Sequence, residues 1–411
     1  MDPFSDVVEV KSFEGKGNCL VAVKRLPFGQ LVFSEEPLFM SNPVTDLFDK
    51  IVLACSNITN LEFQPNWYNG ALVALTSTDT CRVTAFSKKW FPADSNTEES
   101  AIILDALSLT DNENMPLLTS KALRDAVLIW RYNSFAHHSD NNSLIMYNMT
   151  SFMSHSCKPS CVWSFGDGDT FNLRAVRDLV SGCELTISYI SEDQVAMPTI
   201  LRRKLLEGWK FHCSCERCSP SHDKLRVLKC PTCNFGELTL QSVACAETPG
   251  CVAECPGCAV QLTAAQLLEL VEVEQLYFDR LATIDASNLG DLQNVYREAT
   301  RIFTSSNWII YKLESLLLSH SKNLADGLAL AFMQNKVKYL ERLGFPTYSL
   351  GWAYEEIGDW LISTAQQSND TTTLARYQYE KAYWVMRTIT GADSGYSVSI
   401  QTKWANLSEN Q

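Results

Sequence analysis

Cysteines at short, regular spacing are the residues of this chain best suited to carry chemistry. Nine of its 15 cysteines lie between positions 213 and 258. Within that stretch two CxxC pairs are separated by a short segment, and together they supply four thiolates: Cys230, Cys233, Cys255 and Cys258. Four thiolates at this spacing are typical of a closed tetrahedral zinc site, and two-residue gaps favour metal ligands over disulfides. Cys245 and Cys251 lie between the pairs, so one of them could replace a ligand.

A second cysteine group offers three thiolates, from Cys213, Cys215 and Cys218. A structural zinc ion needs four ligands, so a fourth must come from elsewhere in the chain. The best candidate is Cys157. A zinc ion shared with this remote cysteine would hold the C-terminal end of the predicted β region against the middle of that region. We therefore expect two or more zinc ions.

Two kinds of secondary structure must position these groups. Short strands broken by glycine turns are predicted over residues 8–10, 19–23 and 30–33, with a hairpin at 163–165 and 171–173 and a half-buried strand at 184–189. Helical patterns dominate residues 42–127 and everything after about residue 263, with predicted helices at 198–205, 263–281, 289–303, 324–343, 348–364 and 373–390. The last five could pair as antiparallel helices in a TPR-like array.

Several segments, in the same order along the chain, resemble SET-domain protein-lysine methyltransferases, and the SMYD group in particular. They are Glu14-Gly15-Lys16-Gly17-Asn18-Cys19-Leu20, Tyr132-Asn133-Ser134-Phe135, Ser154-His155-Ser156-Cys157-Lys158-Pro159, Gly182-Cys183-Glu184-Leu185-Thr186-Ile187-Ser188-Tyr189 and Phe211-His212-Cys213-Ser214-Cys215-Glu216-Arg217-Cys218. Each segment is weak alone, and their joint order carries the resemblance. It covers roughly residues 7 to 218.

The resemblance implies an α+β protein with a pseudoknotted SET-type β fold, a helical insert, a post-SET zinc site, an extra zinc ribbon and an all-α, TPR-like C-terminal domain. The expected boundaries are 1–41 and 131–211 for the two SET parts, 42–130 for the insert, 212–260 for the zinc region and 261–411 for the helical domain. A MYND finger is not expected, because residues 35–130 contain two cysteines, Cys55 and Cys81.

The resemblance also implies the site. S-adenosylmethionine (AdoMet) would be bound by Lys16, Gly17, Asn18, Asn133, Ser154, His155, Tyr189 and Phe211. Tyr189 would be the catalytic tyrosine, and Phe135 and Trp209 are candidates for the other walls of the lysine channel. An aromatic channel beside a sulfonium disfavours the ammonium form of lysine, so the amine would arrive neutral. Cys157 would join Cys213, Cys215 and Cys218 on zinc.

Departures from the family pattern favour a second interpretation. Cys19 stands where the family has a glycine and Ser154 where it has asparagine, while Ser160 and Cys183 replace an asparagine and a glutamate. The shorter Ser154 side chain removes a hydrogen-bonding arm from the cofactor site. The alternative to an active enzyme is therefore a weak or inactive SET-fold scaffold that binds protein partners through its helical domain.

Charge and composition limit the partners. The formal net charge of −13 gives no bulk attraction for nucleic acid and suits a basic, lysine-containing protein segment. The first residues lack a basic segment followed by an apolar run, and no stretch is apolar and long enough to span a bilayer. We expect a soluble intracellular monomer without direct nucleic-acid or membrane contacts, in the cytoplasm, the nucleus or both.

Overall fold

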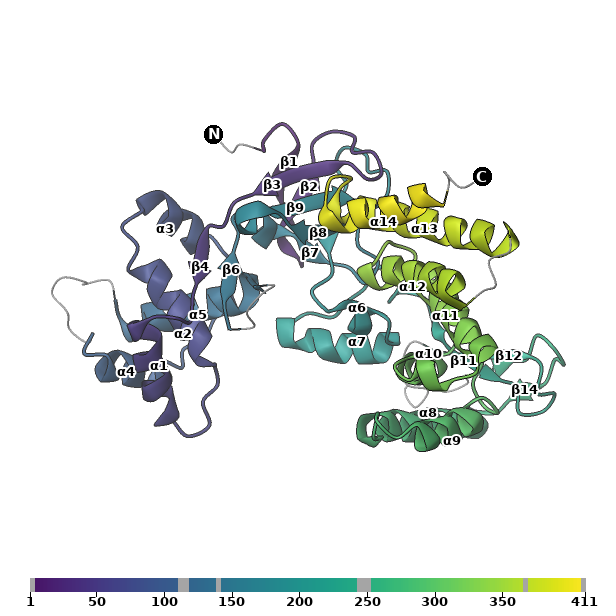
Figure 1. The fold of residues 1–411 in the computed structure, drawn as a ribbon. Helices are drawn as coiled ribbons and strands as arrows, with labels where there is room; N and C mark the ends of the chain where they lie inside the picture. The colour runs from purple at the N-terminus through teal and green to yellow at the C-terminus, as the bar shows by residue number, and fades with distance from the viewer. Residues whose placement is uncertain (1–3, 110–117, 138–141, 242–252, 365–368, 408–411) are drawn as a thin grey trace.

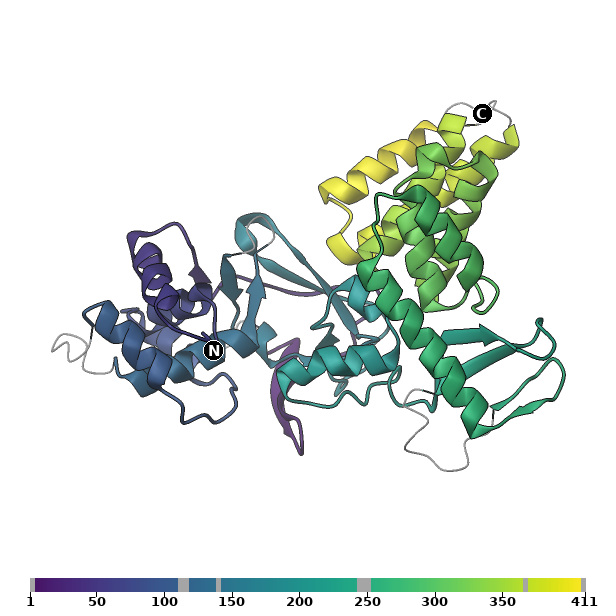
Figure 2. The same ribbon diagram turned by 90° about the horizontal axis from the view of Figure 1, so that it is seen from below.

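The computed structural model describes residues 4–109, 118–137, 142–241, 253–364 and 369–407. A group of helices lies at one end of the molecule, small sheets form its centre, and a stack of helices forms the other end (Figures 1 and 2). The predicted α+β class, with a helical insert and a helical C-terminal region, is confirmed. Every helix within the described ranges is too short or too polar to cross a lipid bilayer.

Ten short strands build the centre of the molecule: β1 (Val8–Phe13), β2 (Gly17–Ala22), β3 (Leu31–Glu35), β4 (Phe39–Ser41), β5 (Ser134–Ala136), β6 (Leu144–Met146), β7 (Ser154–His155), β8 (Cys161–Phe165), β9 (Phe171–Ala175) and β10 (Thr186–Ile187). They form an antiparallel β1–β2 pair, two antiparallel three-stranded sheets in the orders β3-β9-β8 and β4-β6-β5, and a parallel β7–β10 pair. Strands before the insert thus pair with strands after it.

The central sheets contribute to one apolar core, and β9 shows a clear alternation of buried and half-buried positions. On β9, Phe171, Leu173 and Ala175 are fully buried, whereas the residues between them are half-buried. Leu20 of β2 and Ile187 of β10 enter the same core. On β9 the period of two therefore fixes which face of the strand turns inward.

The predicted strand over residues 184–189 is shorter than expected. β10 contains two residues, Thr186 and Ile187, because its partner β7 also contains two. Glu184, before it, makes a separate antiparallel bridge to Val21 of β2. The segment from Glu184 to Ile187 therefore pairs first with β2 and then with β7.

The described residues of the insert, on either side of 110–117, form the helices α1 (Asp46–Ser56), α2 (Pro65–Leu75), α3 (Thr80–Ser87), α4 (Glu98–Ala106) and α5 (Ser120–Asn133). Helices α2 and α5 cross closely at Gly70, where an added Cβ atom would lie 2.7 Å from the ring of Trp130. Glycine at this position allows the indole of α5 to lie against the backbone of α2.

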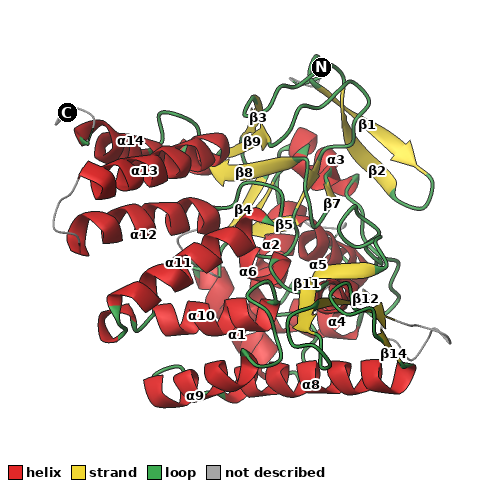
Figure 3. Ribbon diagram, turned by 90° about the vertical axis from the view of Figure 1, so that its right-hand side faces the viewer, coloured by secondary structure: helices red, strands yellow, loops and turns green. Residues whose placement is uncertain are grey.

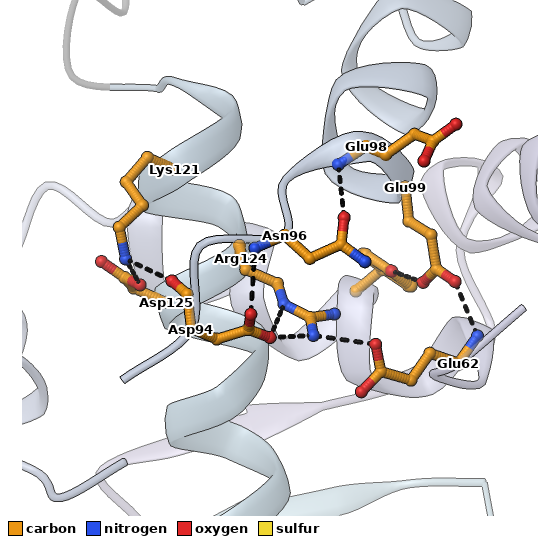
Figure 4. Close-up of polar contacts among 9 residues, drawn as sticks. Glu62, Asp94, Asn96, Glu98, Glu99, Lys121, Arg124 and Asp125 are labelled. Carbon is orange, nitrogen blue, oxygen red and sulfur yellow. Dashed lines mark hydrogen bonds and ion pairs between the residues drawn. The ribbon is translucent and has the colours of Figure 1, made fainter. Parts of the chain in front are cut away.

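The buried side chain of Arg124 on α5 holds two loops of the insert in place, one of them the long loop before α4. The side chain of Arg124 on α5 is 3% exposed, and it donates hydrogen bonds to Asp94 and, at 2.8 Å, to Glu62 (Figure 4). Its guanidinium also lies 4.7 Å from the ring centre of Phe63. Because Asp94 and Glu62 lie on two separate loops, one arginine holds both loops to the same helix.

After the sheets come two short helices, a 3-10 turn and four strands: α6 (Glu192–Val195), α7 (Thr199–Leu206), η3 (Glu207–Trp209), β11 (His222–Lys229), β12 (Glu237–Gln241), β13 (Ala253–Glu254) and β14 (Gln261–Leu262). The helical stack follows, with α8 (Ala264–Thr283), α9 (Leu289–Ala299), α10 (Trp308–Leu318), α11 (Asp326–Glu341), α12 (Tyr348–Thr364), α13 (Asn369–Thr390) and α14 (Gly395–Asn406). Figure 3 shows these helices in successive layers from α8 and α9 to α13 and α14.

The predicted helices are present, with shifted ends, but two helices of the stack were not predicted. Helix α10 is apolar on most of its circumference, so its sequence shows no amphipathic period. In α14, by contrast, the buried residues are Ser397 and Ile400. Helix α9 ends at Ala299, four residues before the predicted end, and Phe303 is buried in the turn that follows.

The helical stack is joined by specific hydrogen bonds to α6, the short helix that follows the central sheets. The carboxylate of Glu192 on α6 accepts the backbone N–H groups of Tyr348 and Ser349, at 2.6 and 2.8 Å, and the hydroxyl of Ser349 at 2.7 Å. An acidic side chain at a helix N-terminus satisfies free N–H groups and complements the helix dipole. The hydroxyl of Tyr339 on α11 donates to the carbonyl of Ala196 at 2.6 Å.

Candidate active site

The parallel pair β7–β10 brings His155 and Tyr189 together. Ile187 lies opposite His155 in this pair, and the backbone N–H of Tyr189 donates to His155 Nδ1 at 3.0 Å. The hydroxyl of Tyr189 donates to the carbonyl of Met153. Both ends of Tyr189 are therefore fixed against the strand that carries His155.

Three aromatic side chains surround Tyr189. Its ring centre lies 5.4 Å from that of His155, 5.9 Å from that of Trp209 and 6.2 Å from that of Phe211. Trp209 ends η3, and Lys210 next to it has a left-handed backbone with φ of 60°, which turns the chain toward Phe211. The structure thus brings together four side chains, His155, Tyr189, Trp209 and Phe211, from a stretch that spans 56 positions of the sequence.

Burial keeps both polar rings neutral. It raises the pKa of Tyr189 well above its usual value, so the hydroxyl stays protonated. Burial also lowers the pKa of His155 to about 4, assisted by the charges of Arg202 and Arg217. Because Nδ1 of His155 accepts a hydrogen bond, the proton of the neutral ring lies on Nε2, which is 3.2 Å from the sulfur of Cys157.

The glycine turn that was predicted to contact the cofactor has a left-handed backbone at both of its glycines. Gly15 and Gly17 have φ values of +73° and +76°, and open space lies where a Cβ atom would be. Lys16 between them forms an ion pair with Glu184 at 2.7 Å, and that hydrogen bond raises the pKa of Lys16. Asn18 accepts a hydrogen bond from Ser12 across the β1–β2 hairpin.

Cys19 and Ser154, the two departures from the family pattern, touch each other. The hydroxyl of Ser154 donates to the sulfur of Cys19 at 3.2 Å, and Cys19 is fully buried. Burial raises the pKa of this thiol. Glu184 lies beside this pair, and hydrogen bonding from Lys16 and Ser154 lowers the pKa of its carboxyl, against the effect of burial. Within the described part of the chain, its buried Oε1 atom makes no hydrogen bond of standard geometry. This acceptor is available to a donor group of a ligand.

The side chains of Asn133 and Phe135 have partners of their own inside the protein. The side-chain amide of Asn133 donates at 2.8 Å to the carbonyls of Trp90 and Ile129, so both of its N–H bonds are used inside the protein. Phe135 packs among the rings of Tyr147, Trp163 and Phe171, at 5.8, 5.5 and 5.3 Å. Phe135 and Tyr189 nevertheless contact the same apolar core.

The four cysteines of the first predicted zinc site converge. The sulfur atoms of Cys157, Cys213, Cys215 and Cys218 all lie within 4.8 Å of one another, and those of Cys157 and Cys218 are 3.6 Å apart. Sulfur ligands at about 2.3 Å from a tetrahedral zinc ion lie roughly 3.8 Å apart. The cluster therefore fits zinc. Nε2 of His155, 3.2 Å from Cys157, would orient one of the ligands.

The second predicted zinc site, the ribbon, also converges. The sulfur atoms of Cys230, Cys233, Cys255 and Cys258 lie within 4.8 Å of one another, with two pairs at 3.8 Å. Strands β11 and β12 carry one knuckle, and β13 and β14 flank the other. A Cβ atom on Gly236 would lie 2.2 Å from the sulfur of Cys255, so this position requires glycine. Cys245 and Cys251 fall outside the described residues.

Sequence reasoning missed two groups near Tyr189. One is the carbonyl of Met153, which accepts from the tyrosine hydroxyl and, as a backbone group, has no sequence signal. The other is Arg131 on α5, whose guanidinium lies 5.5 Å from the ring of Trp209. The sequence could have indicated Arg131, because it directly precedes the Tyr132–Phe135 segment that resembles the family pattern.

Comparison with known proteins identifies the class of domain. Residues 17–190 match the family model of the SET domain, so the chain contains a SET domain. Several of its sequence relatives are named SET and MYND domain-containing proteins, and others are named histone-lysine N-methyltransferases. It is 40% identical over 73 residues to the human histone-lysine N-methyltransferase SMYD3, which is 18% of this chain and 16% of that protein. It is 31% identical over 80 residues to a SET and MYND domain-containing protein of Dictyostelium discoideum, 20% of this chain and 23% of that protein.

These matches cover a limited part of each relative. The histone-lysine N-methyltransferase ASHR1 of Arabidopsis thaliana is 37% identical over 75 residues, 18% of this chain and 15% of its own length. The matched segments thus span less than a quarter of these relatives. Among solved structures, the SET domain of LSMT bound to lysine and AdoHcy aligns with 100% of this chain and 88% of its own, at 13% identity and a TM-score of 0.32. A similarity this low supports no conclusion about the site.

Proposed function

We propose that this protein is an AdoMet-dependent protein-lysine N-methyltransferase. The observation that carries the proposal is the junction of His155 and Tyr189 on two short parallel strands, enclosed by Trp209 and Phe211. Support also comes from the SET match and from the printed names of SMYD3 and ASHR1, both histone-lysine N-methyltransferases.

The residues present fit such a cofactor. The left-handed Gly15 and Gly17 leave room for close approach, and the unpaired Oε1 of Glu184 could accept from a cationic amino group. We propose Lys16, Gly17, Asn18, Asn133, Ser154, His155, Tyr189 and Phe211 as its binding residues. The cofactor supplies a methyl group carried on a cationic sulfur.

Tyr189 would position the lysine amine. Its hydroxyl already donates to the carbonyl of Met153, which leaves the phenolic oxygen to accept an N–H bond from the neutral amine and direct its lone pair. Trp209, and Phe135 deeper in the core, would form the aromatic walls. Such walls lower the pKa of the incoming lysine by desolvation, so that a nucleophilic lone pair is present.

The substrate would be a protein segment with a lysine among other basic residues, as the net charge of −13 favours. We further propose that the protein acts as a monomer in the cytoplasm, the nucleus or both, without binding nucleic acid or membranes. The division of the chain would be 1–41 and 131–211 for the SET parts, 42–130 for the insert, 212–260 for the zinc region and 261–411 for a TPR-like domain.

A second candidate function is a SET-fold scaffold with little or no transfer activity. The observations that favour it are the contact between Ser154 and Cys19 and the amide of Asn133, whose donors are already used. Partners would then bind the helical stack.

One experiment separates the two functions. Calorimetry with AdoMet is followed by transfer of a labelled methyl group to a library of lysine peptides, with the wild type, Tyr189→Phe and Tyr277→Phe. Tyr277 on α8 also loses a hydroxyl in its variant, but it lies in the helical stack. The enzyme requires AdoMet binding and transfer that falls at least ~100-fold in Tyr189→Phe alone. Intact, zinc-loaded protein that transfers to no peptide supports the scaffold.

A further inference from the structure

A pocket of about 430 Å³ lies between the zinc ribbon and the helical stack, separate from the candidate active site. The ribbon contributes Lys229, Asn234, Phe235 and Glu237, and the stack contributes residues of α9, α10, α11 and the connection between α9 and α10. Pockets of this size hold small ligands or single side chains.

Glu314 of α10 lines this pocket and is 2% exposed. Its Oε1 atom accepts hydrogen bonds from the hydroxyl of Tyr296 at 3.0 Å and from the amide of Asn335 at 2.9 Å. No lysine, arginine or histidine in the described ranges forms an ion pair with it. Burial raises the pKa of Glu314 to about 7, which the two hydrogen bonds oppose.

A neighbouring buried glutamate shows what Glu314 lacks. Glu274 of α8 is 6% exposed, and it forms an ion pair with Arg226 and accepts the indole N–H of Trp308 at 2.8 Å. A buried carboxylate without a cation is costly, because neutral donors offset only part of its lost hydration. Glu274 therefore has its counter-ion inside the protein, whereas Glu314 faces a cavity.

The walls of this cavity suit a cation. Tyr296 and the buried Phe303 are lining residues from the stack, and Phe235, 73% exposed, is the aromatic lining residue from the ribbon. Aromatic faces attract ammonium groups. The one lysine among the lining residues, Lys229, donates its Nζ to the carbonyl of Thr300 at 2.6 Å and lies opposite Glu237 across the β11–β12 pair. The ammonium group of Lys229 is thus held at the Thr300 carbonyl, and the acidic Glu237 lines the pocket with it.

We propose that this pocket binds an organic ammonium group, the side chain of a lysine or methylated lysine in a protein partner, with Glu314 as its counter-ion and Phe235 at its entrance. The proposal does not depend on methyl-transfer activity. It gives the ribbon a role beyond stabilising the fold, because four of the twelve lining residues of the site belong to the ribbon.

The test uses the full-length, zinc-loaded protein and three probes: Nα-acetyl-lysine methylamide, its ε-trimethylated form and the neutral norleucine analogue. Binding is measured by calorimetry for the wild type, Glu314→Gln and the control Glu298→Gln. Glu298 is an exposed residue of α9 that pairs with Arg280 outside the pocket. We expect both ammonium probes to bind, norleucine not to bind, and Glu314→Gln alone to weaken binding at least ~10-fold.

Phe235→Leu provides a second readout, because the exposed position keeps an apolar side chain and loses the aromatic face. We expect it to weaken the trimethylated probe about 3-fold, in line with an exposed cation–π contact. Equal binding of norleucine, absence of binding, or binding that survives Glu314→Gln and is lost in Tyr189→Phe would each overturn the proposal. The last result would assign the ammonium to the candidate active site.

Discussion

The guanidinium of Arg131 lies 5.5 Å from the ring centre of Trp209, and the ring of Trp209 lies 5.9 Å from that of Tyr189. Arg131 also faces Trp67 and Tyr132, at 5.8 and 5.7 Å. It forms no ion pair with any carboxylate in the described ranges. A positive charge from the helical insert therefore lies against an aromatic ring that itself contacts the ring of the candidate catalytic tyrosine.

Arg131 should lower the pKa of the target lysine, since a nearby cation disfavours the ammonium form. In Arg131→Met the rising limb of the pH–rate profile is expected to move upward by about half a pH unit to one unit. Activity near pH 7 would then fall several-fold and recover at high pH. Arg297→Met, on an exposed face of α9, is the control. A pH–rate profile unchanged by Arg131→Met would show that the charge of Arg131 has no effect on the pKa of the lysine amine.

The two zinc sites should differ in their effect on the cofactor. Cys215→Ser removes a ligand from the cluster that holds Phe211 near His155, and it is expected to abolish AdoMet binding. Cys233→Ser disrupts the ribbon and should leave AdoMet affinity within about 3-fold of wild type. Metal analysis should give two zinc ions per wild-type chain and one in each variant. Equal loss of AdoMet binding in both variants would refute this division.

The contact between Cys19 and Ser154 should limit cofactor affinity. Ser154→Asn restores the longer side chain that the family pattern has, and we expect AdoMet to bind about 3- to 10-fold more tightly, as one added hydrogen bond allows. Cys19→Gly frees space but removes a buried thiol. Because the two side chains touch, calorimetry on the double variant should show non-additive effects. Additive effects would mean that the contact is not coupled to the cofactor.

Arg124 should stabilise the insert. Arg124→Met keeps much of the apolar stem but leaves Asp94 and Glu62 without their cation, and we expect a loss of about 2–3 kcal/mol in the free energy of unfolding. Denaturant unfolding measures this change. Lys121→Met on the same helix removes an exposed pair with Asp125 and should cost less than about 1 kcal/mol.

Glu314 should make stability depend on pH. Its pKa is raised from 4.5 to about 7 in the folded state, so folding favours its protonated form and this contribution is lost as pH rises toward 7. Relative to wild type, Glu314→Gln should gain stability between about pH 4.5 and 7, by at most about 3 kcal/mol. Melting temperatures across this range would show the gain. A constant difference from pH 4 to 8 would contradict it.

The sequence predicted those strands and metal ligands that residues close together in the chain determine. CxxC pairs bring two thiolates together within one turn, and the period of two in Phe171, Leu173 and Ala175 marks a strand face. The β7–β10 pair was not predictable, because two-residue strands leave no period. The buried helix α10 was missed because its sequence lacks a polar face. The contact of Arg131 with Trp209 arises from packing between the insert and η3, which neither segment encodes alone.

The three hydrogen bonds accepted by Glu192 bear on how the molecule can move. Glu192 follows Tyr189 by three residues, and its carboxylate is anchored to the first turn of α12. A hinge motion that swung the helical stack away from the sheets would have to break these bonds or pull on the segment that holds the tyrosine. The position of the helical stack and the orientation of the Tyr189 ring are therefore linked. A protein that binds the stack and shifts it would also change the position of the tyrosine.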